Sequence, residues 1–211
     1  AATVPPDFWR IPAVQTRRAF FASLFVLTAV VAPVALDGLG AQTTQAAPIR
    51  RFMEIGPGLY RGGQPDKAGY ERLRDMGIRT VVNFRTGDDE RAMVEALGMK
   101  YIHIPVHFRW FGGELPEAAV TRFFAIVDDA SHGPVFFHCK RGADRTGAFA
   151  ALYRITRQGW SIDRAYSEAR DVGMRWWYPA VKGELHEHSG RIGRNEARET
   201  ASPSITMQVA R

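Results

Sequence analysis

The run VFFHCKRGADRTG, residues 135–147, constrains the fold more than any other part of the chain. It begins with a short apolar segment, typical of a strand buried on both faces of a parallel sheet. It leads directly into RTGAFAALYRITRQG, which has the pattern of an amphipathic helix. In α/β proteins, ligands bind where strands end and the following helices begin. Cys139, the only cysteine in the sequence, stands at such a place.

The middle of the chain repeats this alternation of strand and helix patterns. Apolar runs predict strands at IRTVVNF, KYIHIPV and PVFFHC, with two shorter extended pieces at FMEI and LYRG. Capping residues, glycines and apolar periodicity predict helices over residues 66–76, 88–97, 116–130, 145–159, 162–172 and 177–186. The sequence therefore predicts an α/β fold with a central, mostly parallel sheet of about four to five strands flanked by helices.

The length of 211 residues favours one folded domain with extensions at both ends. We expect the folded domain to occupy residues 48–190, after an amino-terminal segment at 1–41 and a polar linker at 42–47. Residues 191–211 lose the apolar periodicity and are rich in Gly, Ser and charged side chains. This composition predicts a disordered tail.

The amino-terminal segment reads TRRAFFASLFVLTAVVAPVALDGLGAQ, an order of basic, apolar and small residues. This order is typical of a bacterial export signal, and TRRAFF resembles the twin-arginine signature of one export route. An uncleaved membrane anchor and a core helix are the alternatives. We expect a protein that is exported to the periplasm or anchored in the inner membrane, with membrane contact only through this segment.

The chain has 28 basic and 22 acidic residues, a net charge of +6, which favours anionic partners. The basic residues are scattered and form no recognised binding module, so nucleic acid is not an expected partner. One cysteine excludes a disulfide framework and a cysteine-rich zinc site, and we expect no metal. Arg85 and the turn GDDE, residues 87–90, are interpreted as a salt-bridged surface.

The loop after Cys139 has the residue types that hold a phosphate group. Gly142 and Gly147 let the backbone curve into a nest of N–H groups at the start of a helix, which is a site for anions. Arg145, six positions after Cys139, offers a planar fork to two phosphate oxygens. The same surroundings stabilise the thiolate form of the cysteine, and His138 is expected to hold the loop rather than act as a base.

These residues carry a family resemblance. His138-Cys139, five residues, then Arg145-Thr146-Gly147 resembles the signature of the cysteine-dependent protein tyrosine and dual-specificity phosphatases. LYRGGQP, GIRTVVNFR and PVFFHC are similar in order and spacing to the small bacterial, plant and fungal dual-specificity-like branch. The resemblance implies that residues 48–190 are a phosphatase domain that works through a phosphocysteine intermediate and needs no metal or other cofactor.

The resemblance also implies a role for each residue of the loop. Cys139 is the nucleophile, Arg145 is the phosphate clamp, and the Thr146 hydroxyl donates to the sulfur. The N–H groups from Lys140 to Arg145 form the cradle. The residues expected to bind substrate are the rest of this loop and its neighbour: His138, Lys140, Arg141, Gly142 and Ala143.

The general acid of the family, an aspartate before the third helix, has no counterpart here. The corresponding stretch IPVHFRWFGGELPEA contains no aspartate. Asp144, inside the cysteine loop, is the favoured candidate, with Glu114 and His107 as alternatives. Asp144 has an ordinary interpretation as well, as a residue that pins the loop.

The substrate class stays open at this point, between a phosphorylated protein and an inositol phosphate. The sequence CKRG puts two positive charges beside the phosphate, which suits an inositol polyphosphate or a phosphoinositide. A catalytically weak, phosphate-binding pseudophosphatase is a further alternative, since the usual acid is missing. An inert buried thiol and a sulfurtransferase are the remaining interpretations of Cys139.

Overall fold

The computed structural model describes residues 49–108 and 112–201. The expected export segment at 1–41 and the linker at 42–47 lie outside the described residues, and so does 202–211. Among the helices of the described part, none combines the length and the apolar character that a membrane crossing requires.

A five-stranded sheet forms the centre of the domain, in the order β1-β2-β5-β3-β4. β1 and β2 pair antiparallel, and all other neighbours are parallel. The predicted mostly parallel α/β sheet is thereby confirmed. The strands are β1 (Met53–Gly56), β2 (Leu59–Gly63), β3 (Thr80–Asn83), β4 (Lys100–His103) and β5 (Val135–Cys139).

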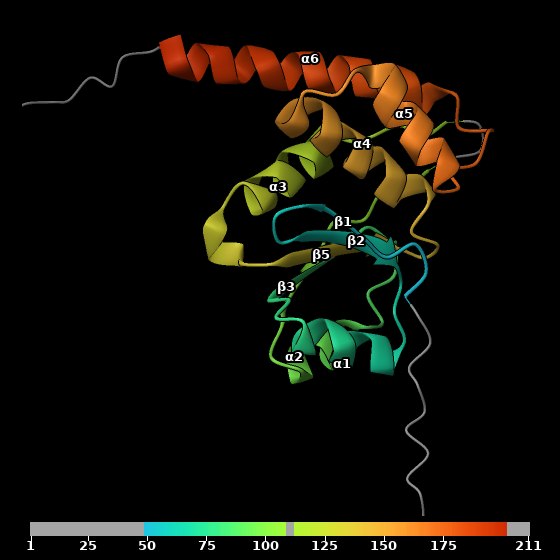
Figure 1. The fold of residues 1–211 in the computed structure, drawn as a ribbon, viewed down its shortest axis with the longest axis vertical. Helices are drawn as coiled ribbons and strands as arrows, with labels where there is room; N and C mark the ends of the chain where they lie inside the picture. Colours follow the sequence, from blue (N-terminus) through green and yellow to red (C-terminus); the bar gives the residue numbers. More distant parts are fainter. Residues whose placement is uncertain (1–48, 109–111, 202–211) are drawn as a thin grey trace, which may run out of the picture. The chain divides into compact units, whose positions relative to one another are not determined.

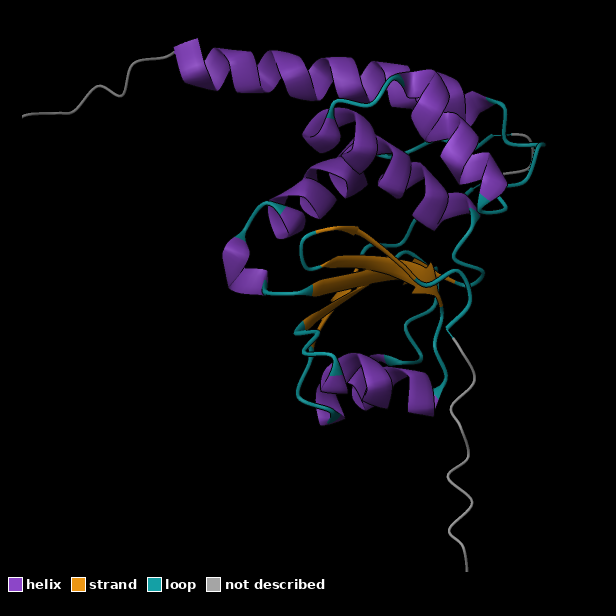
Figure 2. Cartoon of the chain, viewed as in Figure 1, coloured by secondary structure: helices purple, strands orange, loops and turns teal. Residues whose placement is uncertain are grey.

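Helices cover both faces of the sheet, as Figures 1 and 2 show. α1 and α2 lie on one face, and α3, α4, α5 and α6 lie on the other (Figure 1). The helices are α1 (Lys67–Asp75), α2 (Arg91–Ala96), α3 (Glu117–Val127), α4 (Asp144–Gln158), α5 (Ile162–Asp171) and α6 (Ala180–Ala201), with a short 3-10 helix at Ala130–His132.

The helix ends follow the capping residues that the sequence suggests. The carboxylate of Asp66 accepts a hydrogen bond from the Gly69 amide at 2.8 Å at the start of α1. α4 ends at Gln158, and the following residue, Gly159, adopts a left-handed conformation with φ 67°. The helix predicted over residues 66–76 is therefore confirmed, whereas the one predicted over residues 88–97 is reduced to α2.

Two apolar cores, one on each face, hold the helices to the sheet. The larger core packs the rings of Phe84, Phe123, Phe137 and Phe149 against one another, with centroid distances between 4.1 and 5.9 Å. The smaller core lies under α1 and α2 and includes Tyr70, Leu73, Val81 and Phe136. Strand residues that alternate between the two cores explain why the strands read as continuous apolar runs.

The predicted disordered tail is wrong for residues 191–201, because α6 continues to Ala201. Two ion pairs tie this part of the helix to other elements: Arg191 to Glu117 at 2.5 Å, and Arg157 to Glu196 at 2.8 Å. Ala, Glu and Arg are also good helix formers. The apolar periodicity is therefore missing because this part of α6 is a largely exposed helix, not because the chain is disordered.

The register of the sheet decides where the strands end. In the parallel pairs, Gly63 lies opposite Cys139, and Asn83 lies opposite His138. The loops that follow β2, β3 and β5 therefore meet at one edge of the sheet, beside the start of α4.

Candidate active site

The cysteine loop joins the end of β5 to the first turn of α4, as the sequence predicts. Cys139 is the last residue of the strand and is only 2% exposed. Residues 140–143 form the turn, and α4 begins at Asp144. The thiol therefore lies at the floor of the loop, close to the amino terminus of a 15-residue helix.

Gly142 can only be a glycine. Its φ is 70°, which side chains rarely adopt, and a Cβ atom there would lie 2.3 Å from the amide nitrogen of Gly63. The contact is with backbone at the end of β2, so neither side can give way. The two glycines of LYRGGQP, Gly62 and Gly63, thus lie in close backbone contact with the cysteine loop.

Two arginines donate hydrogen bonds to carbonyl groups of the cysteine loop: Arg51, which precedes β1, and Arg61 of β2. Arg51 donates from Nη1 to the carbonyl of Arg141 at 3.0 Å, and Arg61 donates from Nη2 to the carbonyl of Gly142 at 2.7 Å. Because a peptide unit is planar and trans, its N–H points opposite to its carbonyl. The amides of Gly142 and Ala143 therefore point away from these arginines, in the direction that a nest requires.

Arg145 lies at a pocket beside the loop. Its Nη1 donates to the carbonyls of Phe84 at 3.1 Å and Val106 at 3.3 Å, which fixes the side chain against the ends of β3 and β4. Within residues 49–108 and 112–201, no hydrogen bond uses its Nε or Nη2. These two nitrogens remain for the oxygens of a phosphate group.

The pocket has a volume of about 270 Å³ and a polar lining. It brings together the guanidinium groups of Arg145 and Arg175, although Arg175 was not among the residues predicted from the sequence. Its walls are Thr86, Val106, His107, Phe108, Asp144, Arg145, Arg175 and Tyr178.

The three candidate acids differ in position. His107 is exposed and lines the pocket, whereas Glu114 is exposed and is not part of its lining. Asp144 lines the pocket but is buried, and both of its oxygens are held by Arg175: Oδ1 accepts from the backbone amide at 2.9 Å, and Oδ2 forms an ion pair with Nη2 at 2.8 Å. A general acid must aim a proton at the leaving oxygen, so this geometry favours the pinning role of Asp144 over the predicted acid role.

His138 faces the other side of the sheet from Cys139. Its ring is fully buried, with Nε2 3.4 Å from the Tyr70 hydroxyl and 3.5 Å from a carboxylate oxygen of Glu90. Burial lowers the pKa of His138 to about 3, and the positive charges of Arg85 and Arg145 act in the same direction. The ring is therefore neutral at pH 7 and lies out of reach of the pocket, in agreement with a structural role.

The prediction of a salt-bridged surface at Arg85 and residues 87–90 is confirmed for Asp88 and Asp89, which are exposed and pair with Arg91 and Arg85, and it is wrong for Glu90. Glu90 is buried and pairs with Arg85 at 2.5 Å. Gln64 donates to Glu90 at 2.6 Å and accepts from the ammonium group of Lys140 at 3.1 Å. Burial raises the pKa of Glu90. Gln64 thereby links Glu90 to Lys140 of the cysteine loop.

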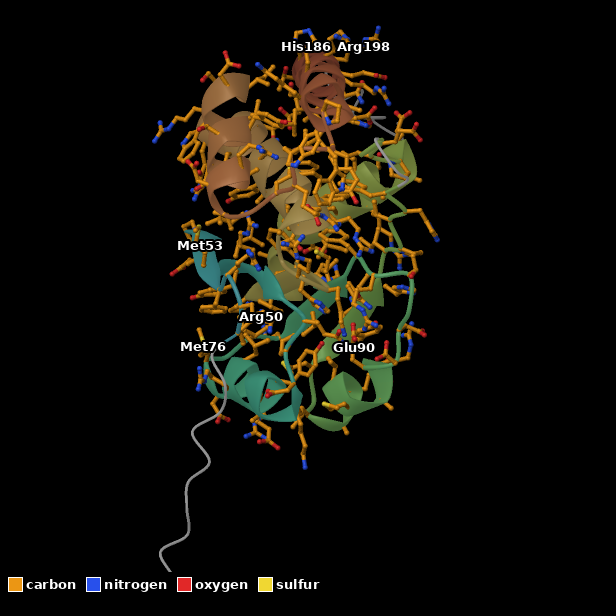
Figure 3. All side chains as sticks on the ribbon, turned by 90° about the vertical axis from the view of Figure 1, so that its right-hand side faces the viewer. Arg50, Met53, Met76, Glu90, His186 and Arg198 are labelled. Atoms are coloured by element: carbon orange, nitrogen blue, oxygen red, sulfur yellow. The ribbon has the colours of Figure 1, made fainter. Side chains whose placement is uncertain are left out.

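Figure 3 looks onto the edge of the sheet where the strands end. Glu90 lies there on the side of α1 and α2, away from His186 and Arg198 of α6. The sequence contains one usable signal for this network: Gln64 belongs to LYRGGQP, the stretch that ends opposite Cys139. Nothing local to Glu90 indicates that it is buried.

The Thr146 hydroxyl does not make the expected hydrogen bond. It is buried, and it has no hydrogen-bond partner among the described residues. The donation to the Cys139 sulfur is therefore not made in this structure, although Thr146 lies in the first turn of α4 as predicted.

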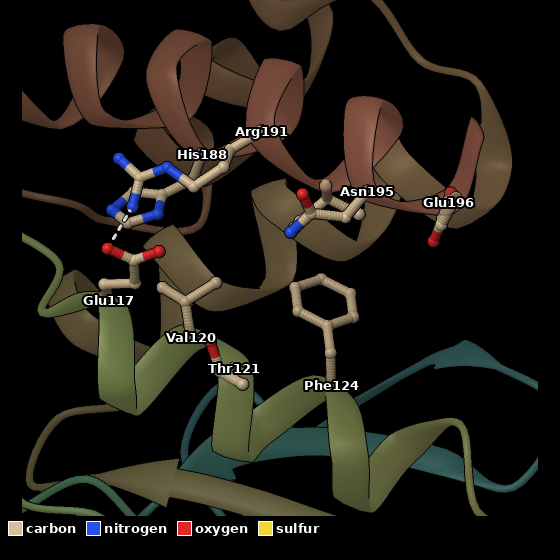
Figure 4. A pocket seen from close by; sticks show the side chains of 9 residues that line it. Glu117, Val120, Thr121, Phe124, His188, Arg191, Asn195 and Glu196 are labelled. Carbon is tan, nitrogen blue, oxygen red and sulfur yellow. Dashed lines mark ion pairs between the residues drawn. The ribbon is translucent and has the colours of Figure 1, made fainter. Parts of the chain in front are cut away.

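A second pocket, of about 180 Å³, lies between α3 and α6 (Figure 4). Val120, Phe124 and Ile192 line it, and the ion pair of Glu117 with Arg191 crosses one end. None of the residues from the cysteine loop contributes to it. Of the residues predicted for chemistry, Asp144, Arg145 and His107 line the pocket beside Arg145, whereas Cys139 and Thr146 are not part of its lining.

Sequence comparisons agree with this site. A family model described as "DSP-PTPase phosphatase fused to NAD+ Kinase" matches residues 49–178. The dual specificity protein phosphatase TpbA of Pseudomonas aeruginosa is 33% identical over 128 residues, 60% of this chain and 56% of TpbA. Inositol diphosphatase DSP3 of Arabidopsis thaliana is 23% identical over 135 residues, 62% of this chain and 66% of DSP3. The chain thus spans just over half the length of TpbA.

Solved structures show the same fold. The core catalytic domain of the PP-IP phosphatase SIW14 from S. cerevisiae superposes with a TM-score of 0.64 at 18% identity, over 75% of this chain and 98% of that one. TpbA superposes with a TM-score of 0.58 at 30% identity, over 70% of this chain and 95% of that one. The family match covers the sheet, the cysteine loop and the pocket, and the chain therefore belongs to the DSP-PTPase family of phosphatases.

Proposed function

We propose that this chain hydrolyses phosphate monoesters through a phosphocysteine intermediate. One observation carries the proposal: a buried thiol ends a central strand, under a loop whose carbonyls are held outward, beside an arginine with free donors. This arrangement binds a phosphate group and presents a nucleophile to it in the same geometry.

Binding comes first. The dianion of the substrate enters the cradle, where the loop amides and the amino terminus of α4 donate to its oxygens. Arg145 adds two donors from the side of the pocket. These groups also stabilise the extra charge on the equatorial oxygens in the transition state.

Two displacements follow. The Cys139 thiolate attacks phosphorus in line with the leaving oxygen, so that an S–P bond forms while the P–O bond to the leaving group breaks. The leaving oxygen takes one proton from a general acid. A water molecule then attacks the phosphocysteine and gives a proton back to that residue, which releases inorganic phosphate and the thiolate.

Of the three candidates, His107 fits the role of general acid best. It is exposed, it lines the pocket with Arg145, and no described residue holds it in a hydrogen bond. We expect His107→Ala to lower turnover of an alkyl phosphate about 10²-fold and that of an aryl phosphate far less, because a good leaving group needs no proton. Glu114→Gln is the matched control and should stay within about twofold. Equal losses on both substrates in His107→Ala would exclude this role.

A phosphorylated protein is the first substrate class. TpbA is described as a dual specificity protein phosphatase, and one of its structures is a complex with pTyr, at a TM-score of 0.56 and 27% identity. The walls of the pocket here include Phe108 and Tyr178, whose rings can lie against an aromatic ester.

An inositol polyphosphate or a phosphoinositide is the second class, and Arg175 is the observation that favours it. This arginine places a second guanidinium group in the pocket with Arg145, and Lys140 is exposed in the cysteine loop. DSP3 is described as an inositol diphosphatase. Arg175→Met should therefore reduce turnover of a multiply phosphorylated inositol more than that of a phosphotyrosine peptide.

The deciding experiment is a substrate panel with the full chain: phosphotyrosine peptides, inositol phosphates and phosphoinositides, each with Cys139→Ser as the control. Turnover by the wild type that is lost in the variant supports the proposal. A wild type that binds inorganic phosphate but turns over none of these substrates supports the pseudophosphatase instead.

We also propose that residues 1–41 direct export to the periplasm or anchor the chain in the inner membrane. The order of basic, apolar and small residues supports this. Fusion of residues 1–41 to a reporter that is active only after export tests it. A reporter that stays in the cytoplasm contradicts the proposal.

A further inference from the structure

Arg61 is a fully buried arginine beneath the cysteine loop. It lies in β2, it is 0% exposed, and it is among the largest side chains of the core. Its Nη2 donates to the Gly142 carbonyl at 2.7 Å. Its Nε and Nη1 are buried and have no hydrogen-bond partner among the described residues.

The charge of Arg61 has no carboxylate partner in the described part of the chain. Its nearest acidic neighbour in electrostatic terms is Glu168 of α5, but that carboxylate is already paired with Arg154 of α4 at 2.8 Å. Burial lowers the pKa of Arg61 to about 10, so the guanidinium group stays charged at pH 7. A buried cation without a counter-charge is strongly unfavourable.

Cys139 is the other acidic group that faces Arg61. Arg61 lies opposite Phe137 in the parallel pair of β2 and β5, and Phe137 and Cys139 point to the same face of the sheet. The side chain of Arg61 then reaches Gly142, so it runs under the loop that starts at Cys139. The ionisable groups around Arg61 are Glu168, Cys139, Arg154 and Arg51. Since Glu168 is paired, the sulfur and a bound phosphoryl group are the anions left for Arg61.

We propose that Arg61 is a positioning residue of the active site, a buried cation that orients the Gly142 peptide and stabilises the thiolate of Cys139 together with the bound phosphoryl group. The inference rests on the proposed function. It explains why an unpaired charge is kept in the core: the counter-charge arrives with ionisation of the thiol and with the substrate. Arg145 then acts on the phosphate from the pocket, and Arg61 acts from below.

The test is the pH dependence of alkylation of Cys139 by iodoacetamide in the full chain. Cys139 is the only cysteine, so the reaction reports on one site, and iodoacetamide reacts with the thiolate alone. At pH 6 we expect alkylation of Arg61→Met to be about tenfold slower than that of the wild type, because a positive charge has been removed from low-dielectric surroundings. The two rates should converge at high pH, where the thiol is ionised in both.

Arg157→Met is the matched control. Arg157 is also an arginine on this face, in α4, but its charge is paired with Asp128 and Glu196, and it is not among the charged neighbours of Arg61. Its loss should lower stability and leave the alkylation rate at pH 6 within about twofold of the wild type. The proposal is overturned if Arg61→Met reacts like the wild type, or if both variants slow equally.

Arg61→Lys decides the matter where Arg61→Met does not fold. Lysine keeps the charge and loses the planar fork. We expect the alkylation rate at pH 6 to stay within about threefold of the wild type, while the affinity for inorganic phosphate falls about tenfold. A lysine variant that is alkylated tenfold more slowly contradicts the electrostatic role. Alkylation needs no turnover, so a chain that hydrolyses no phosphate ester but shows the Arg61 effect refutes the proposed function and leaves this inference standing.

Discussion

The two faces of β5 give the cysteine loop different support. On the face of α1 and α2, His138 is neutral and Glu90 is paired with Arg85, so the buried charges balance. On the face of α4, Arg61 is fully buried and has no carboxylate partner among the described residues. Buried charges that are paired carry a small free-energy penalty and can stabilise the fold. A buried cation without a counter-charge destabilises it and indicates a place where an anion binds. The comparison assigns stability to one face and reactivity to the other.

The largest effect is expected for Cys139→Ser, which removes the anion from the reactive face. Turnover should fall more than about 10⁴-fold, because a serine hydroxyl at this site is not ionised at neutral pH. Binding of inorganic phosphate, measured by calorimetry, should remain. Residual turnover above one per cent of the wild-type rate would mean that the thiol is not the nucleophile.

Arg145→Ala tests the pocket side of the reactive face. Loss of a donor pair that holds the transition-state charge should lower kcat about 10³-fold. The free energy of unfolding should change little, since the Phe84 carbonyl keeps the Val106 amide as a donor and Val106 lines the pocket, where water can replace the guanidinium group. If Arg145→Ala lowers stability and keeps its turnover, the face of α4 supports the fold rather than the reactivity of the thiol.

Glu90→Gln tests the balanced face. Arg85 loses its buried partner and keeps only the exposed Asp89 at 2.8 Å, so we expect a loss of about 2 kcal/mol in the free energy of unfolding by urea. The alkylation rate of Cys139 should stay within about threefold. A change in the alkylation rate as large as that expected for Arg61→Met would show that the face of α1 and α2 also controls the reactivity of the thiol.

The last prediction concerns pH and His138. Its folded pKa of about 3 lies below the usual value of 6.5, so the unfolded chain binds a proton that the folded chain does not. Stability should therefore fall by about 1 kcal/mol per pH unit as the pH drops from 6.5 toward 3, as a contribution of this residue. His138→Asn should lack that part of the slope in urea unfolding at pH 7, 5.5 and 4.5. Equal slopes in the two proteins would contradict the burial of a neutral ring.

The core of the site could be predicted from the sequence because it is contiguous. Cys139, Gly142 and Arg145 lie within one strand-loop-helix run, so their spacing alone places them around one loop. The residues that support this loop could not be predicted in the same way. Arg61, Glu90 and Arg175 come from three distant segments, and in the sequence each is an ordinary charged residue with no local sign of its burial or of its direction.

The choice among the candidate acids shows the same limit. The sequence favours Asp144 because it lies inside the cysteine loop, but the loop after α5 brings Arg175 onto its carboxylate. His107 reaches the pocket because β4 ends beside β3, which depends on the strand order. Residues 191–201 were misjudged as well, since the ion pairs that hold them in α6 join distant parts of the chain.

The sequence by itself determined the alternation of strands and helices, the place of the thiol and the loop that surrounds it, because these depend on local periodicity and on spacing within one run. Only the tertiary structure decided which charges are buried, which of them are paired and which acid faces the pocket. The physical reason is that the energy of a charge depends on its distance from other charges and from water, and those distances exist only once β2, β3 and β5 are aligned side by side.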